Sequence, residues 1–135
     1  MSTVYQERPL PANLIDPATE PYFAAARNGV LRIRICTSCK KPHWYPRPVC
    51  PFCQGDTEWV DALGTGTIYS LSVTRRAGPI PYAIAYVTLD EGVTMLTNIV
   101  DCDLDSAHIG QRVRVCFKPA EGDGVIAMFT PFTPP

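Results

Sequence analysis

Two CxxC pairs, Cys36–Cys39 and Cys50–Cys53, constrain the fold of this chain more than any other feature of its sequence. Ten residues separate the pairs, and each pair can form a turn that brings its two sulfurs to the same side. Four thiolates then hold one tetrahedral metal ion and leave no position open for water. The spacing predicts a closed structural site for zinc, with iron as the second choice because four thiolates also bind iron.

Two disulfides or a thioredoxin-like redox pair are the alternatives for these cysteines. Residues 1–10 lack the apolar core of a secretion signal, and no apolar run is long enough to span a membrane, so we expect a cytoplasmic protein in which disulfides are rare. A redox pair needs one CxxC that opens a helix, and Pro48 and Pro51 do not fit that context. Among the remaining candidates, His43 is interpreted as a surface or loop residue, and Cys102 and Cys116 as small buried hydrophobic residues.

The N-terminal part divides into an arm with a helix (1–29) and a ribbon around the cysteines (30–62). Thr19 as N-cap and Gly29 past the end predict a short helix, on which Tyr22, Phe23 and Ala26 form an apolar stripe. A helix this short is unstable alone, so its apolar face must dock within this chain or on a partner. The ribbon is predicted to have strands at 30–35 and 58–60, and its metal supplies folding free energy that a small core lacks.

The remainder (63–135) is predicted to be mostly β. Apolar residues alternate in five segments that are bounded by turn residues, and there is room for one helical turn at 104–108. The five segments are 67–74, 82–89, 94–100, 112–118 and 124–130. This element order is typical of a five-stranded OB-fold barrel. Tyr69, Tyr82, Tyr86 and Phe117 fall at strand positions that suit a core.

The same residues resemble a known family from Thr19 to Pro131. The resemblance rests on the helix, both CxxC pairs, and the segments 29–31, 44–49, 64–70, 82–87 and 109–115. In this order they are similar to the bacterial and archaeal proteins in which a rubredoxin-like zinc ribbon precedes an OB fold. Lys40 departs from the family, which often has Gly after the second cysteine, but the four ligands are intact.

The resemblance implies a non-catalytic subunit of a hetero-oligomer. Its partner would be a thiolase-like catalytic subunit that acts on acyl-CoA as a thiolase, acyltransferase, synthase or aldolase. The sequence agrees, because neither histidine belongs to a recognisable nucleophile–base arrangement and no glycine-rich phosphate loop is present.

Basic residues and an apolar loop are the candidates for contact with CoA or the partner. Arginine binds phosphate through two parallel hydrogen bonds, although solvated strand faces would also explain these arginines. The loop 77–82 is stiff and apolar, and is either a hairpin tip under the barrel or a wall against the acyl channel. The expected contact residues are Arg47, Arg75, Arg76, Pro79, Ile80, Tyr82, Tyr22 and Phe23.

Nucleic-acid binding is the alternative function, because OB folds and zinc ribbons both do it elsewhere. The charges oppose it. The chain has 12 Lys and Arg against 13 Asp and Glu, a formal net charge of −1, and acidic residues outnumber basic ones from Gly64 onward. A polyanion would gain little from such a surface, so no nucleic-acid partner is expected.

Overall fold

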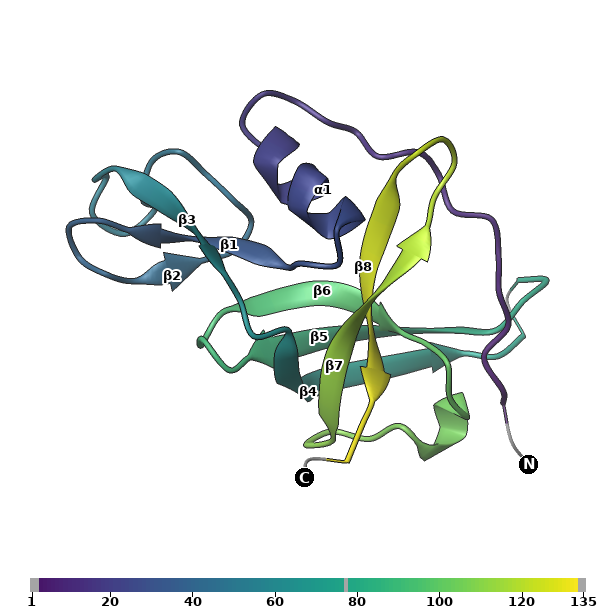
Figure 1. The fold of residues 1–135 in the computed structure, drawn as a ribbon. Helices are drawn as coiled ribbons and strands as arrows, with labels where there is room; N and C mark the ends of the chain where they lie inside the picture. Colours follow the sequence, from purple (N-terminus) through teal and green to yellow (C-terminus); the bar gives the residue numbers. More distant parts are fainter. Residues whose placement is uncertain (1–2, 77, 134–135) are drawn as a thin grey trace.

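A three-stranded ribbon, a closed barrel and one helix make up the protein in this computed structural model, which describes residues 3–76 and 78–133 (Figure 1). The expected mostly-β class, with a zinc ribbon and a five-stranded OB barrel, is confirmed. The elements in chain order are α1 (Glu20–Arg27), β1 (Arg32–Cys36), β2 (Pro42–His43), β3 (Thr57–Asp61), β4 (Thr65–Thr74), β5 (Tyr82–Leu89), β6 (Thr94–Ile99), η1 (Leu104–Ser106), β7 (Arg112–Pro119) and β8 (Val125–Pro131).

The ribbon is an antiparallel sheet in the order β2-β1-β3. Ile33 of β1 faces inward and is fully buried, while Arg34 lies on the other face with its guanidinium 4.5 Å from the centre of the Trp59 ring. This alternation is the period of a half-buried strand, as the sequence predicts. The two-residue strand β2 is too short to leave a sequence signal of its own.

The barrel closes in the order β4-β5-β6-β8-β7, and β7 pairs back with β4. Only the β6–β8 pair is parallel, and the single 3₁₀ turn η1 occupies the predicted insertion between the third and fourth barrel strands. A register shift between Ile68 and Ser70 marks a β-bulge in β4, which is a common device for bending a strand around a barrel. The five predicted segments match the five strands within a few residues at each end.

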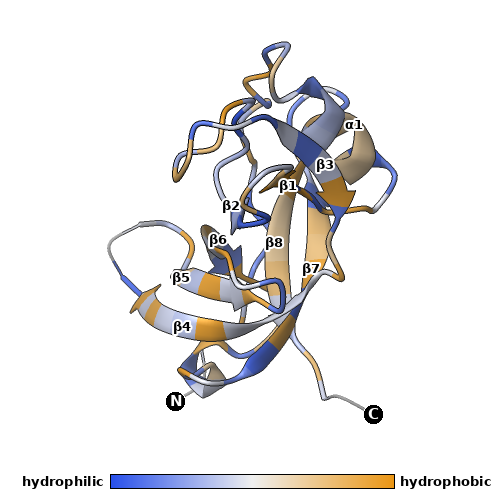
Figure 2. Cartoon of the chain, turned by 90° about the vertical axis from the view of Figure 1, so that its left-hand side faces the viewer, coloured by the Kyte–Doolittle hydropathy of each residue, from blue (hydrophilic) through white to orange (hydrophobic). Residues whose placement is uncertain are grey.

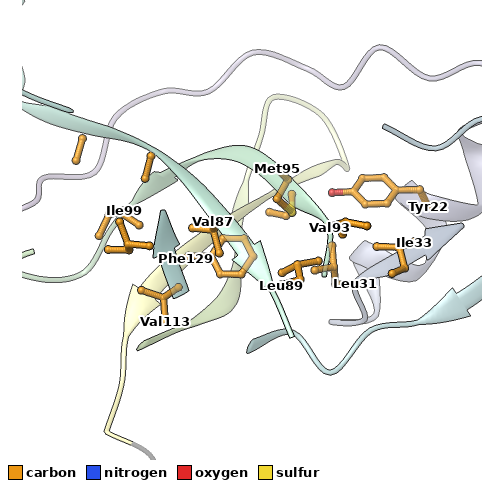
Figure 3. Packing of buried hydrophobic residues seen from close by; sticks show 14 of the residues in the cluster. Tyr22, Leu31, Ile33, Val87, Leu89, Val93, Met95, Ile99, Val113 and Phe129 are labelled. Atoms are coloured by element: carbon orange, nitrogen blue, oxygen red, sulfur yellow. The ribbon is translucent and has the colours of Figure 1, made fainter. Parts of the chain in front are cut away.

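One hydrophobic core runs from the barrel into the ribbon. Phe129 of β8 is fully buried inside the barrel with Val87 and Val113 near it, and the cluster continues to Leu31 and Ile33 beside β1 (Figure 3). Tyr22 of α1 lies at the ribbon end of this cluster and is 6% exposed. The apolar face of the short helix therefore docks within this chain, which decides between the two alternatives that the sequence left open.

Three aromatic residues expected in the core lie outside it. Tyr69 is 69% exposed, Tyr86 is 47% exposed and Tyr82 is half-buried outside the core cluster, so for these three residues the expectation is wrong. In β5 the small residues Ala83 and Ala85 face the interior, because Phe129 already fills it and leaves no room for a tyrosine. Apolar and more polar positions alternate along β4 in Figure 2.

The N-terminal arm runs extended along the barrel. The amide of Tyr5 donates to the Cys102 carbonyl at 2.9 Å, and further along the arm Leu10 accepts from the amide of Glu121 at 3.0 Å. The Lys118 ammonium reaches Glu7 of the arm at 3.0 Å and Asp101 at 2.6 Å. Cys102 is half-buried rather than fully buried, as is Cys116. Within the described residues, no helix is long and apolar enough to cross a membrane.

Candidate metal centre and contact surfaces

Two knuckles with the same backbone geometry carry the four cysteines. The amide of Lys40 donates to the Cys36 carbonyl at 3.1 Å, and the amide of Gln54 donates to the Cys50 carbonyl at 2.9 Å. Lys40 has φ of 62° and Gln54 has φ of 65°, which is the left-handed region that glycine adopts most readily. A left-handed backbone at this position agrees with the glycine expected there from the family that the sequence resembles.

The four sulfurs are arranged for one tetrahedral ion. All four lie within 4.8 Å of one another, with Cys36 Sγ 3.4 Å from Cys53 Sγ and Cys39 Sγ 3.7 Å from Cys50 Sγ. A tetrahedral ion with metal–sulfur bonds of about 2.3 Å separates its ligands by about 3.8 Å, so the donor set fits such an ion with little movement. Cys36, Cys39, Cys50 and Cys53 therefore form a cluster that could hold one metal ion, as the sequence prediction requires.

Backbone amides act on the Cys36 thiol. The amides of Cys39 and Ser38 each donate to Cys36 Sγ at 3.3 Å. These hydrogen bonds, with the one from Cys39 as the largest cause, lower the pKa of the Cys36 thiol to about 6. Thiolate is the form that binds metal, so the fold favours the coordinating state at Cys36, whereas the pKa of the Cys53 thiol is raised to about 11.

His43 does not occupy the position that the sequence suggested. It is 4% exposed in β2, so the prediction of a surface or loop histidine is wrong. Its Nε2 accepts a hydrogen bond from the Arg47 amide at 3.2 Å. Burial lowers the pKa of this imidazole, which keeps it neutral. His43 is not a member of the four-sulfur cluster.

Arg75 and Arg76 line an open groove of about 740 Å³, which Thr3, Pro81 and Asp105 also border. Arg75 is paired with Asp105, with Nη2 2.5 Å from Oδ1, whereas Arg76 has no ion pair among the described residues. Of the adjoining loop, Ala77 lies outside the described residues, Pro79 is exposed and Ile80 is half-buried.

The other candidate contact residues lie in separate hollows. Tyr22 and Phe23 border an apolar groove between α1, the ribbon and the barrel, while Arg47 borders a cleft between the ribbon and the β5–β6 turn. Tyr82 lies at the side of the barrel with the Arg8 guanidinium 4.8 Å from its ring centre. Since Tyr22 is buried and packs edge-on against Phe23 and Trp44, it is a core residue with little surface for a partner.

Sequence reasoning missed an exposed apolar surface on the outside of β4, β5 and β6. Tyr69, Ile84, Tyr86 and Leu96, here called the outer face, are 69%, 39%, 47% and 56% exposed. Tyr86 lies directly opposite Leu96 in the β5–β6 pair. The only signal in the sequence is the alternation of large residues with alanine in β5, which groups these residues on one face but does not say which face is inside.

Comparisons with known proteins identify both the zinc ribbon and the OB-fold barrel. The residues 23–60 match the family model described as the ChsH2 rubredoxin-like zinc ribbon domain, and residues 59–118 match that of the ChsH2 C-terminal OB-fold domain. The chain is 37% identical over 109 residues to a DUF35 domain-containing scaffold protein of Methanothermobacter thermautotrophicus, covering 73% of this chain and 82% of that protein.

A longer relative is the probable enoyl-CoA hydratase alpha subunit of Thermomonospora curvata, which is 36% identical over 133 residues. The match covers 94% of this chain but spans only 41% of that protein.

Among solved structures, a chain of the "Ltp2-ChsH2(DUF35) aldolase" is similar with a TM-score of 0.77 and 33% identity, covering 89% of this chain and 98% of that one. A DUF35 family protein of unknown function from Sulfolobus solfataricus has a TM-score of 0.64 at 14% identity, which shows a shared fold.

Proposed function

This chain belongs to the DUF35 family, in which a ChsH2-type zinc ribbon precedes an OB fold, and we propose that it is a non-catalytic subunit of a hetero-oligomeric enzyme that acts on acyl-CoA. Its partner in this proposal is a thiolase-like subunit that carries the catalytic residues. The chain docks beside that subunit and helps to shape the acyl-CoA site, and its metal is zinc.

The names of the relatives support a role within an assembly. One is a scaffold protein, one is the alpha subunit of a probable hydratase, and one is part of an aldolase that pairs ChsH2 with Ltp2. The hydratase is named for enoyl-CoA, which is an acyl-CoA and so agrees with the proposed substrate class. The thiolase-like nature of the partner rests on the family resemblance in the sequence.

The observation that carries the proposal is the outer face, whose strand side chains carry no charge. The outward positions that pair across β4, β5 and β6 are Thr67, Ser70, Ser72, Thr74, Tyr82, Ile84, Tyr86, Thr88, Thr94, Leu96 and Asn98. None of these residues is Asp, Glu, Lys, Arg or His, and the exposed ones include tyrosine, isoleucine and leucine, while Arg8 of the N-terminal arm borders this face at Tyr82. Protein interfaces have cores that are rich in aromatic residues and depleted of Lys, Glu and Asp, so this surface suits a protein partner.

The groove at Arg75 and Arg76 is the proposed contact for the phosphates of CoA. Both guanidinium groups border an open groove, and Arg76 has no ion pair among the described residues to compete with a phosphate. The exposed Pro79 and half-buried Ile80 adjoin this groove in the chain and provide an apolar wall. Arginine holds phosphate through paired, charge-assisted hydrogen bonds.

Nucleic-acid binding remains the second candidate, because the exposed Tyr86 lies on the second barrel strand, and OB folds bind oligonucleotides on the face of their second and third strands. The strands of the outer face contribute no Lys or Arg, and Arg8 of the arm borders it only at Tyr82, which speaks against this function because a single strand needs a basic track for its phosphates. Weak binding to single-stranded DNA or RNA at physiological salt is the expected result. Sub-micromolar affinity with a steep salt dependence would instead favour the nucleic-acid function.

The test is purification from the native host followed by mass spectrometry under gentle conditions. A complex of this chain with a larger thiolase-like subunit is expected, together with acyl-CoA turnover by the complex and none by this chain alone. A monomer or homo-oligomer without a second kind of chain would contradict the proposal. Turnover of acyl-CoA by the isolated chain would contradict it as well.

A further inference from the structure

A cleft of about 340 Å³ lies between the ribbon and the β5–β6 turn, and the proposed function does not use it. Its ribbon side is formed by His43, Trp44, Arg47 and Phe52, and its barrel side by Val93 and Thr94. Apolar walls with a few polar groups are the usual composition of small-molecule sites, and such sites occur preferentially where two units meet.

His43 has a buried hydrogen-bond donor that nothing in the described chain satisfies. The Arg47 amide donates to Nε2, so Nε2 carries no proton, and the neutral ring must carry its proton on Nδ1. That Nδ1 is buried and has no hydrogen-bond partner among the described residues. A buried donor without an acceptor is costly, and native structures rarely keep one without a partner or a function.

The surroundings of the imidazole are positively charged. Arg34 and Arg47 both act through their charges on His43, and after burial these charges help to lower the pKa of the ring. Lys41 adds a further cation, with its ammonium 5.3 Å from the centre of the Phe52 ring at the cleft wall. The Arg47 guanidinium has no ion pair among the described residues.

Among the described residues, no carboxylate borders the cleft to neutralise these cations. The two acidic residues nearest to it in the chain lie at the β5–β6 turn. Asp90 is paired with Arg112, and Glu91 accepts a hydrogen bond from the Leu63 amide at Oε2 (2.9 Å), while its buried Oε1 has no partner among the described residues. An unpaired donor together with uncompensated positive charge favours a ligand that brings an anionic acceptor.

We propose that this cleft binds a small organic anion, a phosphate or carboxylate on an apolar body, whose oxygen accepts from His43 Nδ1–H and pairs with Arg47. The apolar body packs between Trp44 and Val93. Nδ1 is covered in the free chain, so side chains at the cleft must shift before the anion reaches it. The proposal does not depend on the thiolase-like partner, because every group belongs to this chain.

Nuclear magnetic resonance of the metal-loaded chain tests the donor. Nitrogen shifts of the His43 ring should identify the tautomer with its proton on Nδ1, and addition of phenyl phosphate or phenylacetate should move the Nδ1–H signal. The neutral 2-phenylethanol should leave that signal unchanged. A proton on Nε2, or a signal that neither anion moves, would overturn the proposal.

Calorimetric titration with the same probes tests the site. For probes of this size we expect a Kd of about 1 mM, weakened at least tenfold in Arg47→Gln and in His43→Gln. Glutamine at position 43 removes the Nδ1–H donor but keeps an acceptor for the Arg47 amide, so the ribbon should stay folded. Arg27→Gln changes an exposed arginine at the end of α1 and serves as the control.

Binding that is equal in both variants and the wild type would refute the site. The preferred anion then defines the ligand class, since phenyl phosphate and phenylacetate differ only in the acidic group and its linkage. Metal content measured beside each titration shows that a loss of binding does not come from an unfolded ribbon.

Discussion

Asp90 accepts two hydrogen bonds from the guanidinium of Arg112, at 2.7 Å to Oδ1 and 2.9 Å to Oδ2. This bidentate pair joins the turn after β5 to the start of β7, next to the pairing of β4 with β7 that closes the barrel. Thr65 of β4 also donates to the same carboxylate. One ion pair therefore links three strands at the point of closure.

The first prediction concerns the acid stability of this pair. The hydrogen bonds from Arg112 lower the pKa of Asp90 to about 2, below its unfolded value of about 3.9. The ionised carboxylate thus stabilises the fold above about pH 4, and this contribution disappears as the pH falls towards 2. Arg112→Gln should lower Tm by about 2–4 °C at pH 7, and its Tm should converge with that of the wild type near pH 2.

Thermal melts from pH 2 to pH 7 make this measurement. Arg32→Gln is the matched control, because the Arg32–Asp61 pair is more exposed and makes a single close contact. It should change Tm less than Arg112→Gln does. A constant difference between Arg112→Gln and the wild type across this pH range would contradict the account.

The second prediction is that the four cysteines hold one zinc ion. Elemental analysis of the chain purified without chelator should give about one zinc per chain, and Cys39→Ser or Cys50→Ser should reduce it to near zero. The ribbon should then unfold, because the metal supplies the folding free energy of such small units. Iron in place of zinc would correct the identity of the ion, and four cysteines oxidised in pairs would contradict the site.

The third prediction concerns Lys40, whose positive φ costs a residue with a Cβ atom about 1 kcal/mol. Lys40→Gly should stabilise the metal-loaded chain by about 0.5–1 kcal/mol, less than the full cost because glycine is more flexible when unfolded. Lys41→Gly is the control, since Lys41 has no positive φ, and it should stabilise nothing. Denaturant unfolding at fixed zinc concentration measures both variants.

The fourth prediction distinguishes the two aromatic residues of α1. Tyr22→Ala should destabilise the chain by about 3 kcal/mol, because Tyr22 is buried in the core. Phe23→Ala should cost about 1 kcal/mol in the isolated chain, because Phe23 only packs against the edge of the core. Urea unfolding measures the free energy of unfolding of both variants. Equal losses of this free energy would mean that Tyr22 and Phe23 are buried to the same extent, which would contradict the prediction.

The fifth prediction tests the outer face in the reconstituted complex. Leu96→Asp or Tyr86→Asp should weaken binding of the catalytic partner at least about thirtyfold, because each places an unpaired charge in a buried interface. Phe23→Asp and Tyr82→Asp should weaken it as well if the interface extends to both flanks. Leu63→Asp is the control, since Leu63 is 78% exposed in the link between β3 and β4.

Partner activity should fall in parallel with binding, while metal content stays unchanged. If Leu96→Asp binds the partner with the affinity of the wild type, the outer face is not part of the interface. The existence of the complex itself is tested separately, by the native mass measurement proposed above.

Local signals account for what the sequence predicts well. The metal ligands lie in two CxxC turns that need no long-range information, and the barrel strands follow from alternation between turn residues. The side of a strand that faces inward depends on the rest of the fold. β5 is apolar on both faces, and only the presence of Phe129 in the interior explains why Ala85 points in and Tyr86 points out. The burial of His43 likewise depends on a pairing of β2 with β1 that no local pattern reveals.

The core that runs from Phe129 through Leu31 to Tyr22 has a consequence for the supply of the protein in the cell. Because ribbon and barrel share these contacts, a ligand that binds only the folded ribbon raises the stability of the whole chain by mass action. For a chain whose stability depends on a bound metal in this way, metal supply would set the fraction of folded chains that escape proteolysis. Loss of the metal from the ribbon would then also weaken the barrel, because the two units share one core.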